Sequence, residues 1–162
     1  MKKILLFTLF VNVLPLFSQE KLTFKSLDSL EISADKYFIS ENAPWILLCH
    51  QANSSRGEYK NIAPKLNEAG YNCLAIDLRS GQKIQGINNE PNFRALQKKL
   101  KVGYLDAEKD ILAGILYLLK LSTKPQVFLF GSSYTASLCL KIANHNPSIA
   151  GVFAFSPGEY FG

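Results

Sequence analysis

The chain has 162 residues, of which 48% are hydrophobic and 19% are charged. This length suits one domain with a sheet covered by helices on both sides, and the apolar share argues against a disordered chain. The formal net charge of +5 falls to +3 when Lys2 and Lys3 are removed. With no basic stripe interleaved with aromatic residues, so mild a charge gives no reason to expect a nucleic-acid partner.

Residues 1–18 are predicted to be a secretory signal peptide, and residues 19–162 the exported domain. Two lysines follow the initiating methionine, the apolar run Ile4 to Val13 comes next, and the small Ser18 marks the expected cleavage site. The run is short for a membrane span and is followed by a proline, so no stable membrane anchor is expected. An uncleaved anchor is the alternative. The predicted location is periplasmic or extracellular.

Cys49, Cys73 and Cys139 do not form a disulfide framework in this interpretation. Cys49 lies near the C-terminal end of its predicted strand and Cys73 near the start of the next, and in parallel neighbours those ends are too far apart to bond. Three buried thiols are expected instead. No residue spacing indicates a metal site, and no cofactor is expected.

The exported domain opens with an antiparallel hairpin. Leu22 to Leu27 and Leu30 to Ile39 alternate apolar and polar residues around the turn Asp28-Ser29, which is typical of two half-buried strands at one edge of a sheet. The continuous apolar run Trp45 to Cys49 predicts a buried strand, and it leads into His50-Gln51.

A helix is predicted from Ser55 to Ala69, because Ser55 and Glu58 have the spacing of a capping box and Gly70 ends the apolar periodicity. The next strand is predicted at Tyr71 to Leu78. A helix that starts at Asp106 is expected further on.

Between these elements lies a long polar segment, residues 81–105. It contains one acidic residue, Glu90, and five basic ones: Lys83, Arg94, Lys98, Lys99 and Lys101. One interpretation is a mobile flap that favours acidic substrates. The other is a solvated polar loop with a short helix from Phe93 to Leu100.

The most informative stretch begins at Val127. Four apolar residues, Val127 to Phe130, predict a strand buried on both faces. Gly131 and two serines follow, and apolar residues then return at helical spacing from Ala136 to Ala143. Gly151 to Phe155 predict a last strand, which we expect at the edge of the sheet.

Ser133 stands at the apex of this strand, turn and helix, with Gly131 and Thr135 two residues to either side. This layout is typical of a nucleophile elbow, in which a serine hydroxyl lies above the sheet at the start of a helix. The alternative is an ordinary serine at a helix N-terminus. On this stretch, on the element order and on His50-Gln51, the chain resembles the α/β-hydrolase superfamily, especially its dienelactone-hydrolase-like and exported esterase- or peptidase-like members.

The resemblance implies an α/β fold: a mostly parallel sheet with helices on both faces and an N-terminal antiparallel hairpin. It implies that Ser133 is the nucleophile and that the backbone N–H groups of Ala52 and Tyr134 hold the oxyanion. Gln51 stands where the family has glycine, so the first of these two N–H donors can belong to Ala52 or to a residue next to it. His50 belongs to this oxyanion loop.

The resemblance also implies an acidic residue and then a histidine after the nucleophile. The only histidine downstream of Ser133 is His145, which would lie about 18 Å along the same helix and is expected to cap its end or to face solvent. The alternative is a makeshift base at His50 with Asp77 behind it. We expect instead that the chain is the N-terminal portion of a longer hydrolase.

The leading hypothesis is thus an exported serine hydrolase that cleaves a small-molecule ester or an amide through an acyl-enzyme on Ser133. The alternative is a non-catalytic or remnant protein that keeps the fold. A nucleotide-binding protein is disfavoured, because no glycine-rich phosphate loop follows the first parallel strand. The substrate and the oligomeric state stay open.

Overall fold

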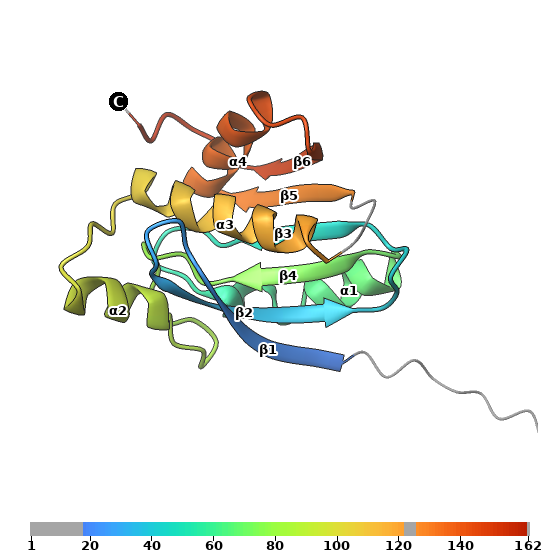
Figure 1. Cartoon of the computed structure of the whole chain (residues 1–162), viewed down its shortest axis with the longest axis horizontal. Helices are drawn as coiled ribbons and strands as arrows, with labels where there is room; N and C mark the ends of the chain where they lie inside the picture. Colours follow the sequence, from blue (N-terminus) through green and yellow to red (C-terminus); the bar gives the residue numbers. More distant parts are fainter. Residues whose placement is uncertain (1–17, 122–125, 162) are drawn as a thin grey trace, which may run out of the picture.

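The computed structural model describes residues 18–121 and 126–161. The predicted signal peptide therefore lies outside the described residues, except for Ser18. One sheet of six strands, in the order β1-β2-β4-β3-β5-β6, forms the centre of the molecule (Figure 1). In the described part of the chain, no helix is long and apolar enough to cross a membrane.

The sheet is mixed, as the sequence predicts. β1 (Ser18–Lys25) and β2 (Glu31–Phe38) form the antiparallel hairpin, and β2 also pairs antiparallel with β4 (Asn72–Ile76). The other strands run parallel to β4: β3 (Trp45–Cys49), β5 (Val127–Ser132) and β6 (Ile149–Phe155), with a shift in the β5–β6 register between Val127 and Phe128. β6 lies at the edge, so the prediction for the last strand is confirmed.

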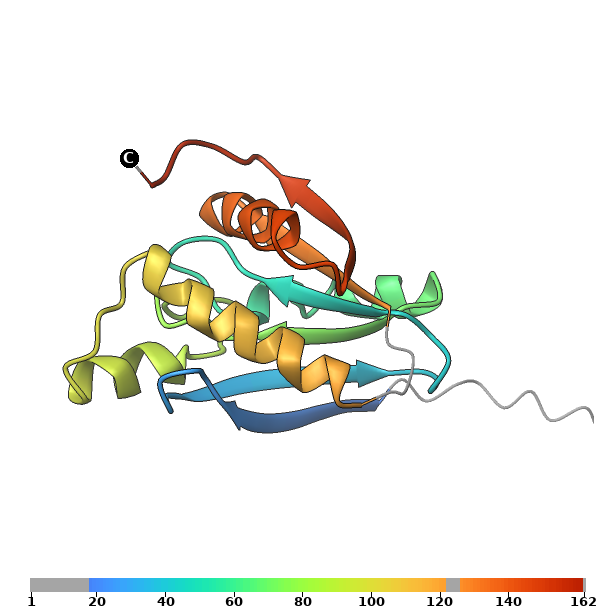
Figure 2. The same ribbon diagram turned by 45° about the horizontal axis from the view of Figure 1, so that its top comes forward.

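Helices cover both faces of the sheet. α3 (Glu108–Leu119) and α4 (Tyr134–Asn144) lie in front of it in Figure 2, where they pack against a core that includes Leu47, Ile76 and Leu129. On the opposite face, η1 (Arg56–Tyr59) and α1 (Ala63–Glu68) cover Ile46, Leu48 and Ala75. Successive residues of the central strands therefore enter different cores, which is why these strands read as continuous apolar runs.

Two short elements complete the chain. α2 (Glu90–Gln97) lies beside β2 and supplies the helix predicted in the polar segment, three residues earlier than expected because the Asn89 side chain caps it by accepting from the backbone N–H of Asn92. The 3-10 turn η2 (Leu105–Ala107) precedes α3 and begins next to the predicted start of that helix.

The single helix predicted from Ser55 to Ala69 is wrong. The chain forms the 3-10 turn η1 and then the separate helix α1, whose second residue is Pro64. Proline has no N–H for the hydrogen bond of a continuous helix and its ring clashes with the preceding turn, but it is well tolerated in a first turn. The apolar periodicity of the sequence continues past this break, so the pattern alone does not reveal it.

The prediction that β5 is buried on both faces is also wrong. Val127 and Leu129 are fully buried on the side of α3 and α4, whereas Phe128 and Phe130 on the other side are half-buried. These rings pack against Phe153 and Phe155 of β6, which are 39% and 52% exposed. Among the described residues, α1 and η1 reach β3 and β4 but leave this aromatic face of β5 and β6 partly open.

A buried arginine joins the hairpin to the helical layer. The guanidinium of Arg79, 1% exposed, binds both carboxylate oxygens of Asp28 at 2.7 and 2.8 Å. It also donates to Asp110 of α3 at 2.8 Å, and that carboxylate accepts the Arg79 backbone N–H at 2.9 Å. The turn of the hairpin, the end of β4 and α3 are therefore fixed to one another.

The cysteine prediction is confirmed. All three thiols are free and buried, and Cys49 lies opposite Ile76 rather than opposite Cys73 in the register of β3 and β4. Burial raises the pKa of the Cys73 thiol to about 12 and that of Cys49 well above its ordinary range. Neither group is a reactive thiolate at neutral pH.

Candidate functional site

The carboxyl ends of β3, β4 and β5 bring the predicted site residues to one edge of the sheet. β3 lies between the other two strands, and its last residue, Cys49, pairs with Ile76 on one side and Gly131 on the other. His50 and Asp77 each follow directly from a strand, and Ser133 follows the last residue of β5. The three strands are therefore direct neighbours in the order β4, β3, β5.

Ser133 forms the turn between β5 and α4. Its backbone has φ 60° and ψ −127°, and it occupies the N-cap position of an 11-residue helix. A positive φ is uncommon for a residue with a side chain and costs about 1–3 kcal/mol, so the surrounding structure must impose it. The Ser133 N–H donates to the Phe155 carbonyl at 2.9 Å, which joins this turn to the end of β6.

The two residues that flank the turn explain how it is held. A Cβ atom on Gly131 would lie 2.5 Å from the Thr135 carbonyl oxygen and 2.6 Å from the Ala136 nitrogen, so only glycine allows the strand to pass this close to the helix. The buried Thr135 hydroxyl accepts from the Ser132 N–H at 2.9 Å and lies 2.8 Å from the Cys49 carbonyl, to which it donates. Thr135 therefore ties the turn to the neighbouring strand β3.

Tyr134 is the first residue of α4, where a backbone N–H has no carbonyl partner within the helix. Its side chain is fully buried and its hydroxyl makes a short hydrogen bond with the Ser80 hydroxyl. The Tyr104 ring stacks on the Tyr134 ring with centroids 4.4 Å apart. The orientation of the first turn of α4 is thus fixed by a side chain that points away from solvent.

The loop after β3 offers one candidate donor rather than two. The Gln51 N–H donates to the Glu58 carboxylate at 3.1 Å, so it is not available to a substrate. The Ala52 N–H has no hydrogen-bond partner among residues 18–121 and 126–161. This contact also corrects the predicted capping box: Ser55 does cap η1, through Gly57, but Glu58 reaches back to Gln51 instead of to Ser55.

His50 is fully buried, and both of its ring nitrogens are engaged. Nδ1 lies 2.7 Å from the Gln51 carbonyl, to which it donates, whereas Nε2 accepts from the Leu78 N–H at 2.9 Å and lies 3.2 Å from the Asn89 amide nitrogen. Because a backbone N–H can only donate, Nε2 must be the unprotonated nitrogen. Burial lowers the pKa of His50 from 6.5 to about 4.

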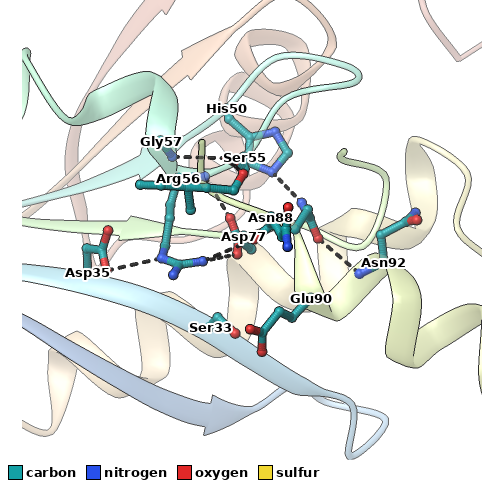
Figure 3. A network of polar contacts seen from close by, with 12 residues as sticks. Ser33, Asp35, His50, Ser55, Arg56, Gly57, Asp77, Asn88, Glu90 and Asn92 are labelled. Carbon is teal, nitrogen blue, oxygen red and sulfur yellow. Dashed lines mark hydrogen bonds and ion pairs between the residues drawn. The ribbon is translucent and has the colours of Figure 1, made fainter. Parts of the chain in front are cut away.

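Asp77 faces Arg56 rather than His50 (Figure 3). One carboxylate oxygen accepts the backbone N–H of Arg56 at 2.7 Å. The other makes a short contact with the Arg56 guanidinium, which also lies 3.1 Å from Asp35. Burial raises the pKa of Asp77 to about 6, although Arg56 acts in the opposite direction. With Nε2 of His50 occupied and Asp77 bound elsewhere, these contacts argue against the makeshift triad in which His50 serves Ser133 as a base.

The second histidine is not near the turn either. His145 is the C-cap residue of α4, at the opposite end of the helix that Ser133 begins, and it is exposed to solvent. This is the place predicted for it. Neither histidine of the chain is therefore positioned to accept a proton from Ser133.

The polar segment 81–105 is built into the site more firmly than a flap would be. Asn89 is buried, and its amide donates to the Leu78 carbonyl at 2.8 Å as well as contacting His50. Arg94 forms ion pairs with Glu90 at 2.6 Å and with Glu31 at 3.2 Å, so this cation is already neutralised. These contacts favour the interpretation as a polar loop with a short helix over that of a mobile flap for acidic substrates.

Sequence reasoning missed three residues of this site. Asn89 carried only the signal of a helix cap, an asparagine ahead of a proline in a first turn. Glu58 was assigned to a capping box, and nothing in its spacing pointed to Gln51. Tyr160 was missed entirely, although its hydroxyl accepts a hydrogen bond from the Ser133 hydroxyl at 3.0 Å.

Comparison with known proteins identifies the fold. No protein-family model matches the chain, and no curated protein matches it in sequence. Among solved structures, an esterase of Pyrococcus furiosus superposes with a TM-score of 0.65 at 21% identity over 87% of this chain and 53% of the esterase. Dienelactone hydrolase of Anabaena variabilis gives 0.64 at 18% identity over 84% and 62%. A carboxyl esterase of Bacillus coagulans gives 0.60 at 18% identity over 83% and 43%.

The chain has the fold of the α/β-hydrolases, which confirms at the level of the fold the resemblance found in the sequence. It spans about half the length of the Pyrococcus esterase structures.

Proposed function

We propose that this chain belongs to a serine hydrolase that cleaves a carboxylic ester, or an amide, through an acyl-enzyme on Ser133. The observation that carries the proposal is the backbone of Ser133, held at φ 60° and ψ −127° between a parallel strand and a helix. This conformation is costly and has no structural purpose as a simple helix cap, since the Ser133 side chain caps no N–H of α4. A nucleophile elbow accounts for it.

In the proposed reaction, Ser133 Oγ attacks the carbonyl carbon of the substrate and a base takes its proton. The negative charge that develops on the carbonyl oxygen is held by the N–H groups of Tyr134 and Ala52, assisted by the positive end of the α4 dipole. The base then protonates the leaving alcohol or amine. Water attacks the acyl-enzyme by the same route in reverse and releases the acid.

Neither His50 nor His145 is the base in this proposal, because the first is engaged at both nitrogens and the second lies at the far end of α4. The resemblance to the superfamily implies that the acidic residue and the histidine come from polypeptide outside residues 1–162. His50 instead fixes the loop that carries Ala52. The coding DNA beyond codon 162 tests this: it should encode further apolar strands, an acidic residue and then a histidine.

Acylation of Ser133 tests the chemistry directly. Residues 19–162 are incubated with an activated acetyl ester, and acetylated peptides are counted by mass spectrometry. Without a base, the elbow and its donors should still make Ser133 react about 10³-fold faster than serines outside the site, which is the scale of catalysis left after loss of a triad. Ser133→Ala should abolish the fast site and Ser132→Ala, in the same turn, should not. Equal labelling of Ser133 and exposed serines would reject the proposal.

A non-catalytic protein that keeps the fold is the alternative, and one observation favours it. The Ser133 hydroxyl is satisfied by Tyr160 rather than by a basic group. If the coding DNA beyond codon 162 holds no acid and histidine in that order, and Ser133 does not acylate selectively, this alternative replaces the first.

Export by residues 1–18 is part of the proposal. The structure bears on it at one point: β1 begins at Ser18, so cleavage after that residue would leave nearly the whole edge strand in the mature protein. Expression of the full chain in a bacterial host, followed by fractionation and N-terminal sequencing, should place the mature chain outside the cytoplasm with Gln19 as its first residue. Retention of Met1 in a cytoplasmic product would contradict it.

A further inference from the structure

The segment that follows β6 does not leave the molecule but returns across the start of α4. We name residues 156–161 the strap. At its first residue the backbone turns with φ 51° at Ser156, and beyond it the chain passes the end of the sheet from which α4 begins (Figure 2). At its other end Phe161 is partly buried against the core that α3 and α4 cover.

Two hydrogen bonds fasten the middle of the strap to α4. The Ser137 hydroxyl donates to the Gly158 carbonyl at 2.7 Å and accepts from the Gly158 N–H at 3.0 Å. Ser137 comes four residues after Ser133, so both hydroxyls lie on the same face of the helix. The strap is therefore attached to the face of α4 on which the candidate nucleophile lies.

Tyr160 extends from the strap to Ser133 itself. Its hydroxyl accepts the Ser133 hydrogen bond at 3.0 Å, and its ring meets the Tyr104 ring edge to face with centroids 6.4 Å apart. The missing side chain of Gly158 leaves room for this ring, since a Cβ atom there would lie 3.1 Å from the Tyr160 ring. Ser133 is half-buried as a result, although Tyr160 is 39% exposed.

We propose that the strap is a closing device for Ser133, in which Tyr160 occupies the position that a general base must take. The Ser133 hydroxyl has a single proton, and in this conformation it is directed to the Tyr160 oxygen. Transfer of that proton to a base therefore requires the Tyr160 hydroxyl to withdraw. This consequence for catalysis rests on the proposed function, whereas the covering of Ser133 by the strap does not.

The contacts that hold residues 156–160 of the strap are few and exposed, so withdrawal of Tyr160 is a small step that leaves Phe161 in place. Three hydrogen bonds between neutral groups attach it, and its residues from Ser156 to Tyr160 are exposed. Removing one hydrogen bond of this kind should raise the open fraction about fivefold. Removing the Tyr160 ring as well should raise it further.

Thiol alkylation measures the opening without any hydrolysis. In a Ser133→Cys background, the rate of reaction with N-ethylmaleimide reports access to the position, because the three natural thiols are buried and react slowly. Tyr160→Ala and Ser137→Ala should each raise the rate about fivefold or more, and Tyr160→Phe should raise it less, since the ring stays. Ser148→Ala, an exposed serine beyond α4, should leave the rate unchanged.

The rates are compared at their high-pH plateau, so that a change in the pKa of the introduced thiol does not count as opening. Circular dichroism and slow reaction of the natural thiols confirm that each variant is folded. If Tyr160→Ala unfolds the protein, the Ser137→Ala rate decides alone. The error of such assays is taken as a factor of about 1.5. The proposal is overturned if Tyr160→Ala and Ser137→Ala both react at the rate of the Ser133→Cys parent within this factor. It is also overturned if the Ser137→Ala rate stays unchanged while Tyr160→Ala reacts faster, because the strap would then not act as one unit.

Discussion

The buried imidazole of His50 should make the folded protein sensitive to mild acid, and replacing it with glutamine should remove part of that sensitivity. In the folded chain, Nε2 accepts from the Leu78 N–H and the ring is shielded from solvent, so a second ring proton is disfavoured. Unfolding exposes the ring and restores its ordinary affinity for protons. The unfolded state therefore gains a proton more readily than the folded state as the pH falls.

The magnitude follows from the two pKa values of His50, 6.5 in the unfolded chain and about 4 in the folded one. His50 is neutral in both states above pH 6.5, so it contributes no pH-dependent loss there. Below that, the loss grows by about 1.4 kcal/mol for each pH unit until the folded pKa is reached. The His50 contribution alone should therefore lower the free energy of unfolding by roughly 2 kcal/mol between pH 7 and pH 5, and by about 3 kcal/mol by pH 4.

Asp77 acts in the opposite direction, because burial raises its pKa from 3.8 to about 6. Its folded form takes up a proton first, so stability is gained as the pH falls from 6 toward 3.8 and is lost as the pH rises through 6. Because the two contributions oppose each other, the free energy of unfolding of the parent chain would change little with pH in this range. A difference between two variants is needed to isolate His50.

The assay is urea unfolding followed by circular dichroism at pH 7, 6, 5 and 4, for the parent chain and for His50→Gln. Glutamine places an oxygen acceptor near the position of Nε2 but does not titrate, so its packing cost is the same at every pH. The parent should lose about 2 kcal/mol relative to the variant between pH 7 and pH 5. A constant difference over this range would refute the reasoning. If the variant does not fold, nuclear magnetic resonance of the His50 ring decides, since the ring should stay neutral down to about pH 5.

Three further predictions concern the turn, the core and the chemistry. Gly131→Ala should lower the free energy of unfolding by about 1–3 kcal/mol, because the new Cβ would collide with the backbone of α4. Gly70→Ala has open space around the new Cβ but a positive φ, so it should cost about 1–2 kcal/mol from backbone strain alone. Thermal unfolding of both variants measures the two losses. Arg79→Met leaves Asp110 buried without its cation and should cost about 3–5 kcal/mol, so the double variant with Asp110→Leu should recover part of the loss in urea unfolding. Residues 19–162 should show at most traces of esterase activity on a small activated ester; brisk turnover that is lost on both Ser133→Ala and His50→Ala would mean that His50 is a base after all.

The parts of the fold that the sequence predicts well are those in which local pattern and packing coincide. Trp45 to Cys49 is apolar throughout because both faces of β3 are covered, so run length and boundaries agree with the structure. The turn at Ser133 was predictable for a similar reason. Gly131 and the residues after it satisfy a steric requirement that lies within six residues of chain.

What could not be predicted depends on partners distant in the chain. Asn89 binds Leu78 across a polar segment with no periodicity, and Arg56 meets Asp35 of β2 and Asp77, which directly follows β4. A buried arginine reads in the sequence like any surface arginine until the strand order is known. His50 is the clearest case, because its residue type suggests a base and only its two hydrogen bonds assign it to the loop.

The arrangement around Ser133 separates two tasks that a serine hydrolase must combine. Positioning is local: the strained backbone, Gly131 and the proposed donor at Tyr134 all belong to one strand-to-helix unit, and the second proposed donor comes from the adjacent loop. Proton transfer is not local, since it needs a base whose pKa and distance depend on other parts of the fold. In the described part of the chain the groups proposed for positioning are present, while the Ser133 hydroxyl donates to the Tyr160 hydroxyl rather than to a histidine or a carboxylate. Under the proposed function, the described residues would therefore supply groups that orient the acyl group but no base that takes the proton of Ser133.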